Sequence, residues 1–154
     1  GLQAQIQRPG RVGDAYRAAY QVVSTEQGRI EQHFPNQPIW VELNEALFGW
    51  VIENLVRNAA DAMEESGRID VRLTLENGKV VITLEDSGKG IPKNKWKTVF
   101  KPGYTTKARG WGLGLSLVKR IVEEYHKGHI QVSNSELGKG TTFRIDLKPI
   151  TAQS

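Results

Sequence analysis

Residues 53–63, ENLVRNAADAM, lie at the centre of the strongest helical pattern in the chain. Apolar residues recur there at intervals of three and four, which predicts an amphipathic helix from Asn44 to Glu65. Asn44 is a good N-cap, and Gly67 follows the end of the pattern. The residues of the apolar stripe are Leu47, Val51, Ile52, Leu55, Ala59, Ala62 and Met63.

Polar side chains interrupt this helix at regular intervals. Asn54 and Asn58 are four residues apart and therefore share one face, and Asp61 follows about one turn later. An amide oxygen is a suitable ligand for the hard cation Mg²⁺. A solvated helix face explains a single asparagine equally well, so the rest of the sequence has to decide between the two interpretations.

The elements around the helix indicate a sheet. Asn77-Gly78 joins RIDVRLTLE to KVVITLED and favours a type I′ turn, so these two stretches form a hairpin. The other expected elements are a helix at 14–23 with Asp14 as N-cap, strands at 29–34 and 39–43, a short helix from Pro92 to about Val99, a loop at 101–112, a helix from Leu113 to Tyr125, and strands at 129–135 and 141–147.

Hairpins that alternate with long helices favour an α/β two-layer sandwich, with a mixed, mostly antiparallel sheet covered on one face by helices. We place this domain at residues 24–150. Residues 1–23 begin with a polar stretch punctuated by Gly and Pro, and we interpret them as a boundary, a linker or a helical remnant.

Composition narrows the class of protein. The chain has 154 residues, enough for one domain, and it contains no cysteine, which excludes disulfide scaffolds and thiolate metal sites. No apolar run is long enough to span a membrane. The formal charge of +4 is scattered rather than gathered into a nucleic-acid-binding motif, so we expect no nucleic-acid partner.

Glycine clusters follow two of the predicted elements. In EDSGKGIP, residues 85–92, Asp86 ends a strand, and Gly88 and Gly90 let the backbone pass close to a ligand. In RGWGLGLSLVKR, residues 109–120, glycines precede a helix, as in many phosphate-binding turns. The first stretch lacks the hydroxyl residue of a P-loop, and the second has GxGxG spacing after a loop, so it is not a Rossmann fingerprint.

Taken in order, these stretches resemble the motifs of the GHKL ATPase superfamily, which includes gyrase, MutL and histidine kinases, and above all those of the catalytic ATP-binding domain of bacterial sensor histidine kinases. NLVRNAADAM resembles the N box, EDSGKGIP the first glycine box, VFKPGYTTK the F box, RGWGLGLSLVKRIV the second glycine box, and GKGTTF the last. The resemblance covers roughly residues 29–148 and implies the Bergerat, or GHKL, fold.

The resemblance also implies roles for individual residues. Asp86 would accept a hydrogen bond from the adenine amino group, Asn58 would ligate Mg²⁺ with Asn54 as its neighbour, and Lys107 would reach the phosphates. Thr142 would support Asp86. The other positions that it assigns to the nucleotide site are Asp61, Gly88, Gly90, Phe100, Tyr104, Gly110, Gly112, Leu113 and Gly114.

The implied function is a sensor histidine kinase domain that uses ATP and Mg²⁺. It would transfer the γ-phosphoryl group to a histidine on a separate dimerisation domain, because His33, His126 and His129 all lack the sequence context of a phosphoacceptor. Asn54 stands where ATP-hydrolysing members carry a water-activating Glu, which favours transfer over hydrolysis.

The implied partners are that histidine-bearing domain and a response regulator, in a membrane-associated homodimeric parent whose catalytic domain is cytoplasmic. The alternative is a regulatory GHKL module that binds ATP or ADP, such as an anti-sigma kinase or a pseudokinase.

Overall fold

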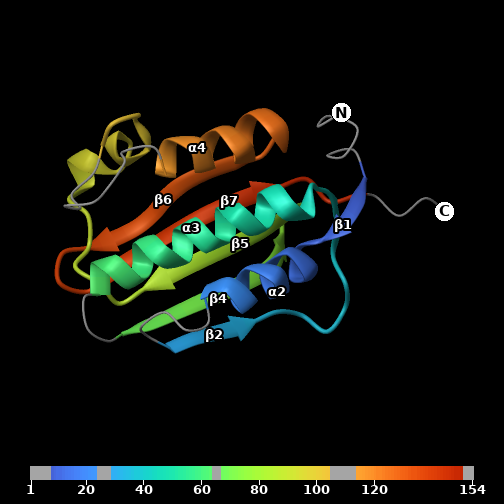
Figure 1. The fold of residues 1–154 in the computed structure, drawn as a ribbon, viewed down its shortest axis with the longest axis horizontal. Helices are drawn as coiled ribbons and strands as arrows, with labels where there is room; N and C mark the ends of the chain where they lie inside the picture. Colours follow the sequence, from blue (N-terminus) through green and yellow to red (C-terminus); the bar gives the residue numbers. More distant parts are fainter. Residues whose placement is uncertain (1–7, 24–28, 64–66, 105–113, 151–154) are drawn as a thin grey trace.

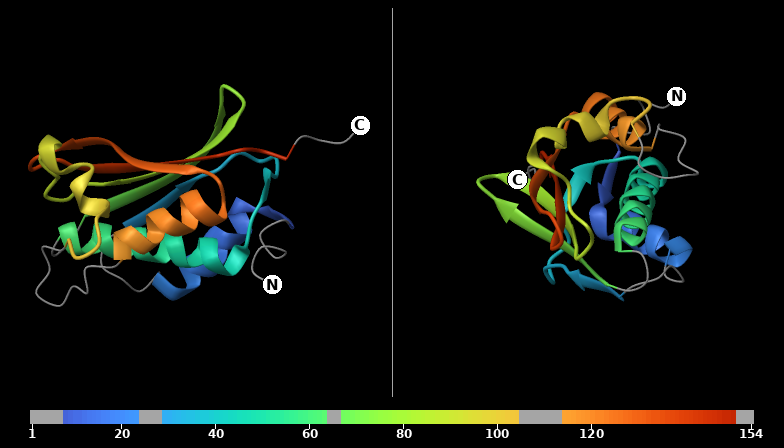
Figure 2. Two further views of the ribbon diagram at one scale, coloured as in Figure 1. Left: turned by 90° about the horizontal axis from the view of Figure 1, so that it is seen from above. Right: turned by 90° about the vertical axis from the view of Figure 1, so that its left-hand side faces the viewer.

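The structure is a computed structural model that describes residues 8–23, 29–63, 67–104 and 114–150. A five-stranded mixed sheet has the order β2-β4-β5-β7-β6, and α2, α3 and α4 cover one of its faces (Figures 1 and 2). This architecture confirms the predicted two-layer sandwich. The elements are β1 Pro9–Arg11, α2 Val12–Val23, β2 Arg29–His33, β3 Trp40–Glu42, α3 Glu45–Met63, β4 Arg68–Glu76, β5 Lys79–Asp86, the 3₁₀ helices η1 Lys93–Lys95 and η2 Thr98–Phe100, α4 Gly114–Arg120, the π-helical turn η3 Ile121–Tyr125, β6 His129–Glu136 and β7 Gly140–Leu147.

The two strongest local predictions are confirmed. Asn44 caps α3, because its Oδ1 accepts a hydrogen bond of 2.9 Å from the N–H of Leu47. Asn77 and Gly78 both have positive φ, 51° and 77°, as a type I′ turn requires. This turn fixes the antiparallel register of β4 and β5.

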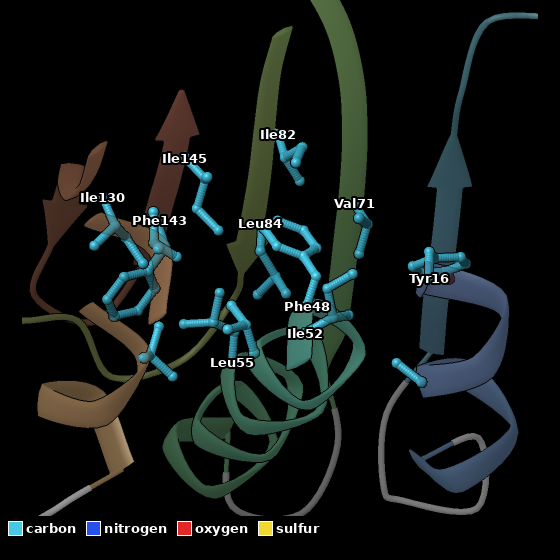
Figure 3. Packing of buried hydrophobic residues seen from close by; sticks show 14 of the residues in the cluster. Tyr16, Phe48, Ile52, Leu55, Val71, Ile82, Leu84, Ile130, Phe143 and Ile145 are labelled. Carbon is cyan, nitrogen blue, oxygen red and sulfur yellow. The ribbon is translucent and has the colours of Figure 1, made fainter. Parts of the chain in front are cut away.

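The hydrophobic core lies between the sheet and the helices. Phe48, Ile52 and Leu55 of α3 point toward side chains of the sheet, which include Leu84 and Phe143 (Figure 3). Complete burial of each such side chain contributes about 1.5–3 kcal/mol relative to exposure. Because burial is favourable, the face of the sheet that carries the apolar residues of β4, β5 and β7 is the face that packs against α3.

The described part of the N-terminal segment, residues 8–23, packs against the rest of the structure, on the N-terminal side of the predicted boundary at residue 24. β1 pairs antiparallel with β3, with Gly10 opposite Val41. α2 starts at Val12, two residues before the predicted cap Asp14, and its Val12, Ala15, Tyr16, Ala19 and Val23 are buried. The Gly/Pro-rich composition before residue 14 resembles a linker, but β3 supplies its hydrogen-bond partners.

Two predicted helices also differ in form. The helix expected at 92–99 is a pair of 3₁₀ turns, η1 and η2. The long second helix ends as an α-helix at Arg120 and continues as a π-helical turn, in which the N–H of His126 donates to the carbonyl of Ile121 at 3.1 Å. Among the helices of the described segments, none has the length and apolar character to cross a membrane.

Candidate functional site

Asp86 is the buried acid of the candidate site. It ends β5 on the face that meets the helices, and it is 5% exposed. Its Oδ1 accepts hydrogen bonds from the backbone N–H groups of Gly88, at 2.8 Å, and Thr141, at 3.3 Å. Burial raises the pKa of the Asp86 carboxyl, and these two donors oppose that rise. Oδ2 receives no hydrogen bond from the described residues and is available to a ligand donor.

The turn after Asp86 is clamped between two other elements. The N–H of Lys89 donates to the carbonyl of Ala62 near the end of α3, at 3.0 Å, and the carbonyl of Lys89 accepts from Gly138 at 2.8 Å. Gly90 has a φ of +82°, and a side chain there would collide with the backbone of Glu136. The predicted glycines 88 and 90 therefore allow the turn to fit between α3 and the β6–β7 hairpin.

The threonine beside Asp86 is Thr141, so the predicted Thr142 is wrong by one residue. Asp86 lies opposite Thr141 in the β5–β7 register, whereas Glu85 lies opposite Thr142. Thr141 is buried, and its Oγ1 lies 2.7 Å from the Oγ of Ser135. Thr142 lies on the other face of the sheet. The alternation along β7 contains the necessary signal, because Phe143 is apolar and faces the core, and Thr141 shares its face.

Ser135 is a second residue that the sequence analysis missed. Its Oγ accepts the N–H of Ile91 at 2.7 Å, and it also bonds the carbonyl of Gly140 at 3.0 Å. Ser135 therefore joins the glycine turn to β7 behind Asp86. No local motif marks this serine, because its partners are 44 and 5 residues away.

The polar face of α3 meets the beginning of α4. The Asn54 Nδ2 donates to the carbonyl of Trp50 at 2.8 Å, which leaves Oδ1 directed away from the helix. A Cβ built on Gly114, the first residue of α4, would lie 3.8 Å from this Oδ1. Asn58 is half-buried one turn further along, and Asp61 is exposed. Two amide side chains thus follow one face of α3 toward the Asp86 turn.

Phe100 and Tyr104 anchor the segment that leads toward residue 105. Phe100 is buried and packs edge-on against Phe143, with ring centroids 6.0 Å apart. Lys119 of α4 places its Nζ 5.5 Å from the centre of the Phe100 ring. Tyr104 is half-buried against the same core. Phe100, the aromatic residue of the predicted F box, is therefore fixed on the face of the sheet that carries Phe143 and Thr141.

The profile of the histidine kinase-, DNA gyrase B-, and HSP90-like ATPase family matches residues 43–151. The chain belongs to this ATPase family. The match includes Asn54, Asn58, Asp86 and the glycine turns, so the membership agrees with the resemblance seen in the sequence.

Relatives of this ATPase domain are kinases. The chain is 42% identical over 111 residues to sporulation kinase E of Bacillus subtilis, covering 71% of this chain and 14% of that protein. It is 45% identical over 95 residues to the sensor histidine kinase ZraS of Escherichia coli K12, covering 62% of this chain and 20% of that protein. The chain thus spans a fifth or less of the length of these two relatives.

Solved structures of histidine kinase ThkA have the same fold. The catalytic domain of histidine kinase ThkA aligns with a TM-score of 0.79 and 28% identity, over 92% of this chain and 94% of that one. ThkA in complex with the response regulator TrrA aligns with a TM-score of 0.76 and 27% identity, over 94% of this chain and 42% of that one.

Part of the predicted site lies outside the described residues of this ATPase domain. Lys107, Gly110, Gly112 and Leu113 fall in 105–113, so their roles remain predictions. Gly114 is described and begins α4.

The three histidines have contacts that hold the fold together. His33 Nε2 lies 2.8 Å from Asp70, and His129 Nδ1 lies 3.1 Å from Glu123. His126 is buried between α3 and η3.

Proposed function

We propose that this chain is the ATP-binding catalytic domain of a sensor histidine kinase and transfers the γ-phosphoryl group of ATP to a histidine on a separate dimerisation domain. The observation that carries the proposal is the Asp86 carboxylate, which is buried, fixed by two backbone donors through Oδ1 and open at Oδ2. The family membership and the kinase relatives support it.

Asp86 would select the base. Its open oxygen is an acceptor, so it pairs with the exocyclic amino group of adenine and repels the carbonyl oxygen that guanine carries at the same position. Because Oδ1 accepts from Gly88 and Thr141, Oδ2 is the oxygen left for the base, and an ionised carboxylate has no donor to offer a carbonyl group. A site whose buried polar group would otherwise stay unpaired discriminates strongly between such ligands.

Asn58 and Asn54 would serve the phosphate end. Their amide oxygens have the hard-ligand chemistry that Mg²⁺ prefers, and Asn58 is the proposed ligand. Mg²⁺ bound there would offset the negative charge of the phosphates. Asn54 bonds the backbone of Trp50 through its amide nitrogen and carries no basic group, so it does not activate water. This favours transfer to a protein acceptor over hydrolysis. Asp61, Phe100 and Tyr104 would surround this site, and Lys107 with Gly110, Gly112, Leu113 and Gly114 would contact the phosphates.

The partners follow from the same proposal. The acceptor histidine would lie on a dimerisation domain in a homodimeric parent, and a response regulator would receive the phosphoryl group next. The ThkA–TrrA structure supports a response regulator as partner, because that complex contains a kinase with this fold. We place the domain in the cytoplasm of a parent that is associated with the membrane.

A phosphotransfer assay tests this function. The chain is mixed with γ-³²P-labelled Mg·ATP and a purified helical-hairpin dimerisation domain from a sensor kinase relative, and label on the hairpin is measured. We expect labelling that depends on the acceptor histidine and disappears with Asp86→Asn. If the chain binds ATP but never labels any hairpin, it is instead a regulatory nucleotide-binding module. If it binds no ATP at all, both functions are wrong.

A further inference from the structure

A pocket of about 270 Å³ lies between α2 and the segment that follows β2. The pocket lies beside the edge strand β2, which β4 separates from β5. β2 runs parallel to β4 and therefore antiparallel to β5, so the chain leaves β2 in the direction opposite to that in which it leaves β5 at Asp86 (Figure 1). A ligand in this pocket would not compete with a nucleotide at Asp86.

One wall of the pocket is aromatic. Tyr16 packs edge-on against Phe34 with ring centroids 5.1 Å apart, and Tyr20 lies one turn along α2, 6.0 Å from Tyr16. Tyr20 is 42% exposed. A cavity of about 150 Å³ already accommodates benzene. The pocket therefore has room for one planar ring with a short substituent.

Tyr16 also contributes a hydroxyl group that has no protein partner in the described part of the chain. Tyr16 is only 5% exposed, and within the described segments its ring contacts Tyr20 and Phe34 while its hydroxyl bonds no other residue. Burial raises the pKa of Tyr16 to about 12, so the hydroxyl stays protonated and remains a donor at neutral pH. No buried side-chain oxygen of the described residues lacks a hydrogen-bond partner, so this hydroxyl is in contact with solvent. An acceptor on a ligand would take the place of solvent as its partner.

The rim of the pocket carries excess positive charge. Arg11 and Arg17 both bind the carboxylate of Asp14, with N–O distances of 2.9 and 3.0 Å. Among the described residues that line the pocket, Asp14 is the only acidic one, and its single charge balances only one of the two guanidinium groups. The side chain of Arg17 is 71% exposed and can turn its free N–H groups toward an anion.

We propose that this pocket binds a planar aromatic ring that carries a carboxylate, either as a free small acid or as the C-terminal phenylalanine of a peptide. The ring packs on Tyr16 and Phe34, and the carboxylate accepts hydrogen bonds from Arg17 and from the Tyr16 hydroxyl. Arg11 stays paired with Asp14 through two hydrogen bonds.

Titration of the whole chain with two probes tests the pocket. The probes are 3-phenylpropanoate, which represents a free acid, and N-acetyl-glycyl-phenylalanine, which represents a peptide terminus. 3-Phenylpropanamide is the neutral control ligand. Backbone amide shifts measured by NMR should change at Gly13, Arg17 and Gln37 on addition of the acid, with an equal dissociation constant in the presence of ATP. The probe that binds more tightly identifies the source of the ligand.

Variants distinguish binding in this pocket from nonspecific attraction of the acid to positive charge on the protein surface. Tyr16→Phe keeps the ring and removes the hydroxyl, and Arg17→Gln removes an exposed charge, so both should fold. Each should weaken binding about tenfold, the effect of losing one charge-assisted hydrogen bond. Arg120→Gln, at another exposed helical arginine with one ion pair, should leave binding unchanged. Absence of shifts at millimolar acid, equal binding of the amide, displacement by ATP or insensitivity to both variants would each overturn the proposal.

Discussion

The imidazole of His126 accepts a hydrogen bond at Nε2 from the backbone N–H of Asn44, 3.1 Å away and 82 residues earlier in the chain. Since Nε2 accepts, the proton of the neutral ring is on Nδ1, which donates to the carbonyl of Ile121 at 2.9 Å. His126 also packs edge-on against Phe48, with ring centroids 5.5 Å apart. One side chain thus joins the start of α3 to the π-helical turn.

This contact predicts a loss of stability in mild acid. Burial lowers the pKa of His126 below its ordinary 6.5, so the unfolded chain binds a proton first as the pH falls. The contribution of His126 is complete above about pH 6.5 and declines below it. Urea unfolding should show that the free energy of unfolding falls by up to about 1.4 kcal/mol more between pH 8 and pH 5.5 in the native chain than in His126→Gln. Equal pH dependence of the two proteins would contradict this.

Asp86→Asn should weaken ATP binding without lowering the stability of the folded domain. The raised pKa means that the ionised carboxylate is unfavourable in the folded protein, and its cost grows as the pH rises through the folded-state pKa. A neutral amide removes that cost, whereas it presents a donor to the amino group of adenine. ATP affinity, measured by calorimetry, should fall at least about a hundredfold. The melting temperature at pH 7.5 should stay the same or rise; a clear fall with retained ATP binding would refute the assignment.

The two neighbouring threonines provide a matched pair. Thr141→Val removes the buried hydroxyl that bonds Ser135 and should cost about 1 kcal/mol of unfolding free energy. Thr142→Val changes a side chain on the open sheet face and should stay within about 0.5 kcal/mol of the native chain. Chemical denaturation of both variants measures the difference. The reverse order would mean that the β7 register is wrong.

Alanine substitution at two glycines with similar φ angles distinguishes the cost of backbone strain from the cost of a steric clash. Gly90 and Gly103 have φ of +82° and +87°, but only at Gly90 would a side chain meet other atoms, those of Glu136 and Leu137. Gly103→Ala should therefore cost about 1 kcal/mol from backbone strain alone. Gly90→Ala should cost more than about 3 kcal/mol or prevent folding. Similar melting temperatures for the two variants would show that the turn can move away from the β6–β7 hairpin.

The parts of this fold that sequence predicted well are those set by neighbouring residues. Helix α3 follows from its apolar stripe and its Asn44 cap, and the β4–β5 hairpin follows from Asn77-Gly78. The turn with Gly88 and Gly90 and its acid Asp86 were predicted together because they are adjacent in the chain and at the end of one strand.

The remaining features depend on residues that are distant in sequence. β1 exists because β3 offers hydrogen bonds to residues that otherwise look like a linker. The π-helical turn ends at a histidine, His126, that accepts a hydrogen bond from the distant residue Asn44. Thr141 is distinguished from Thr142 by the pairing of β7 with β5, and Ser135 is positioned by the hairpin around it. Each of these features depends on a hydrogen-bond partner that is distant in the chain, which the pattern of neighbouring residues does not reveal.

Strand β3 has one more consequence. Val41 pairs with Gly10 on one side and with Pro149 on the other, and the N–H of Ile150 donates to the carbonyl of Trp40 at 3.0 Å. The two ends of the folded chain therefore meet on the same three-residue strand. Residues 8 and 150 therefore lie near each other, and a short glycine-rich loop can link them. A circular permutant with this link, opened at the exposed turn residue Gly78, should fold with the same sheet order.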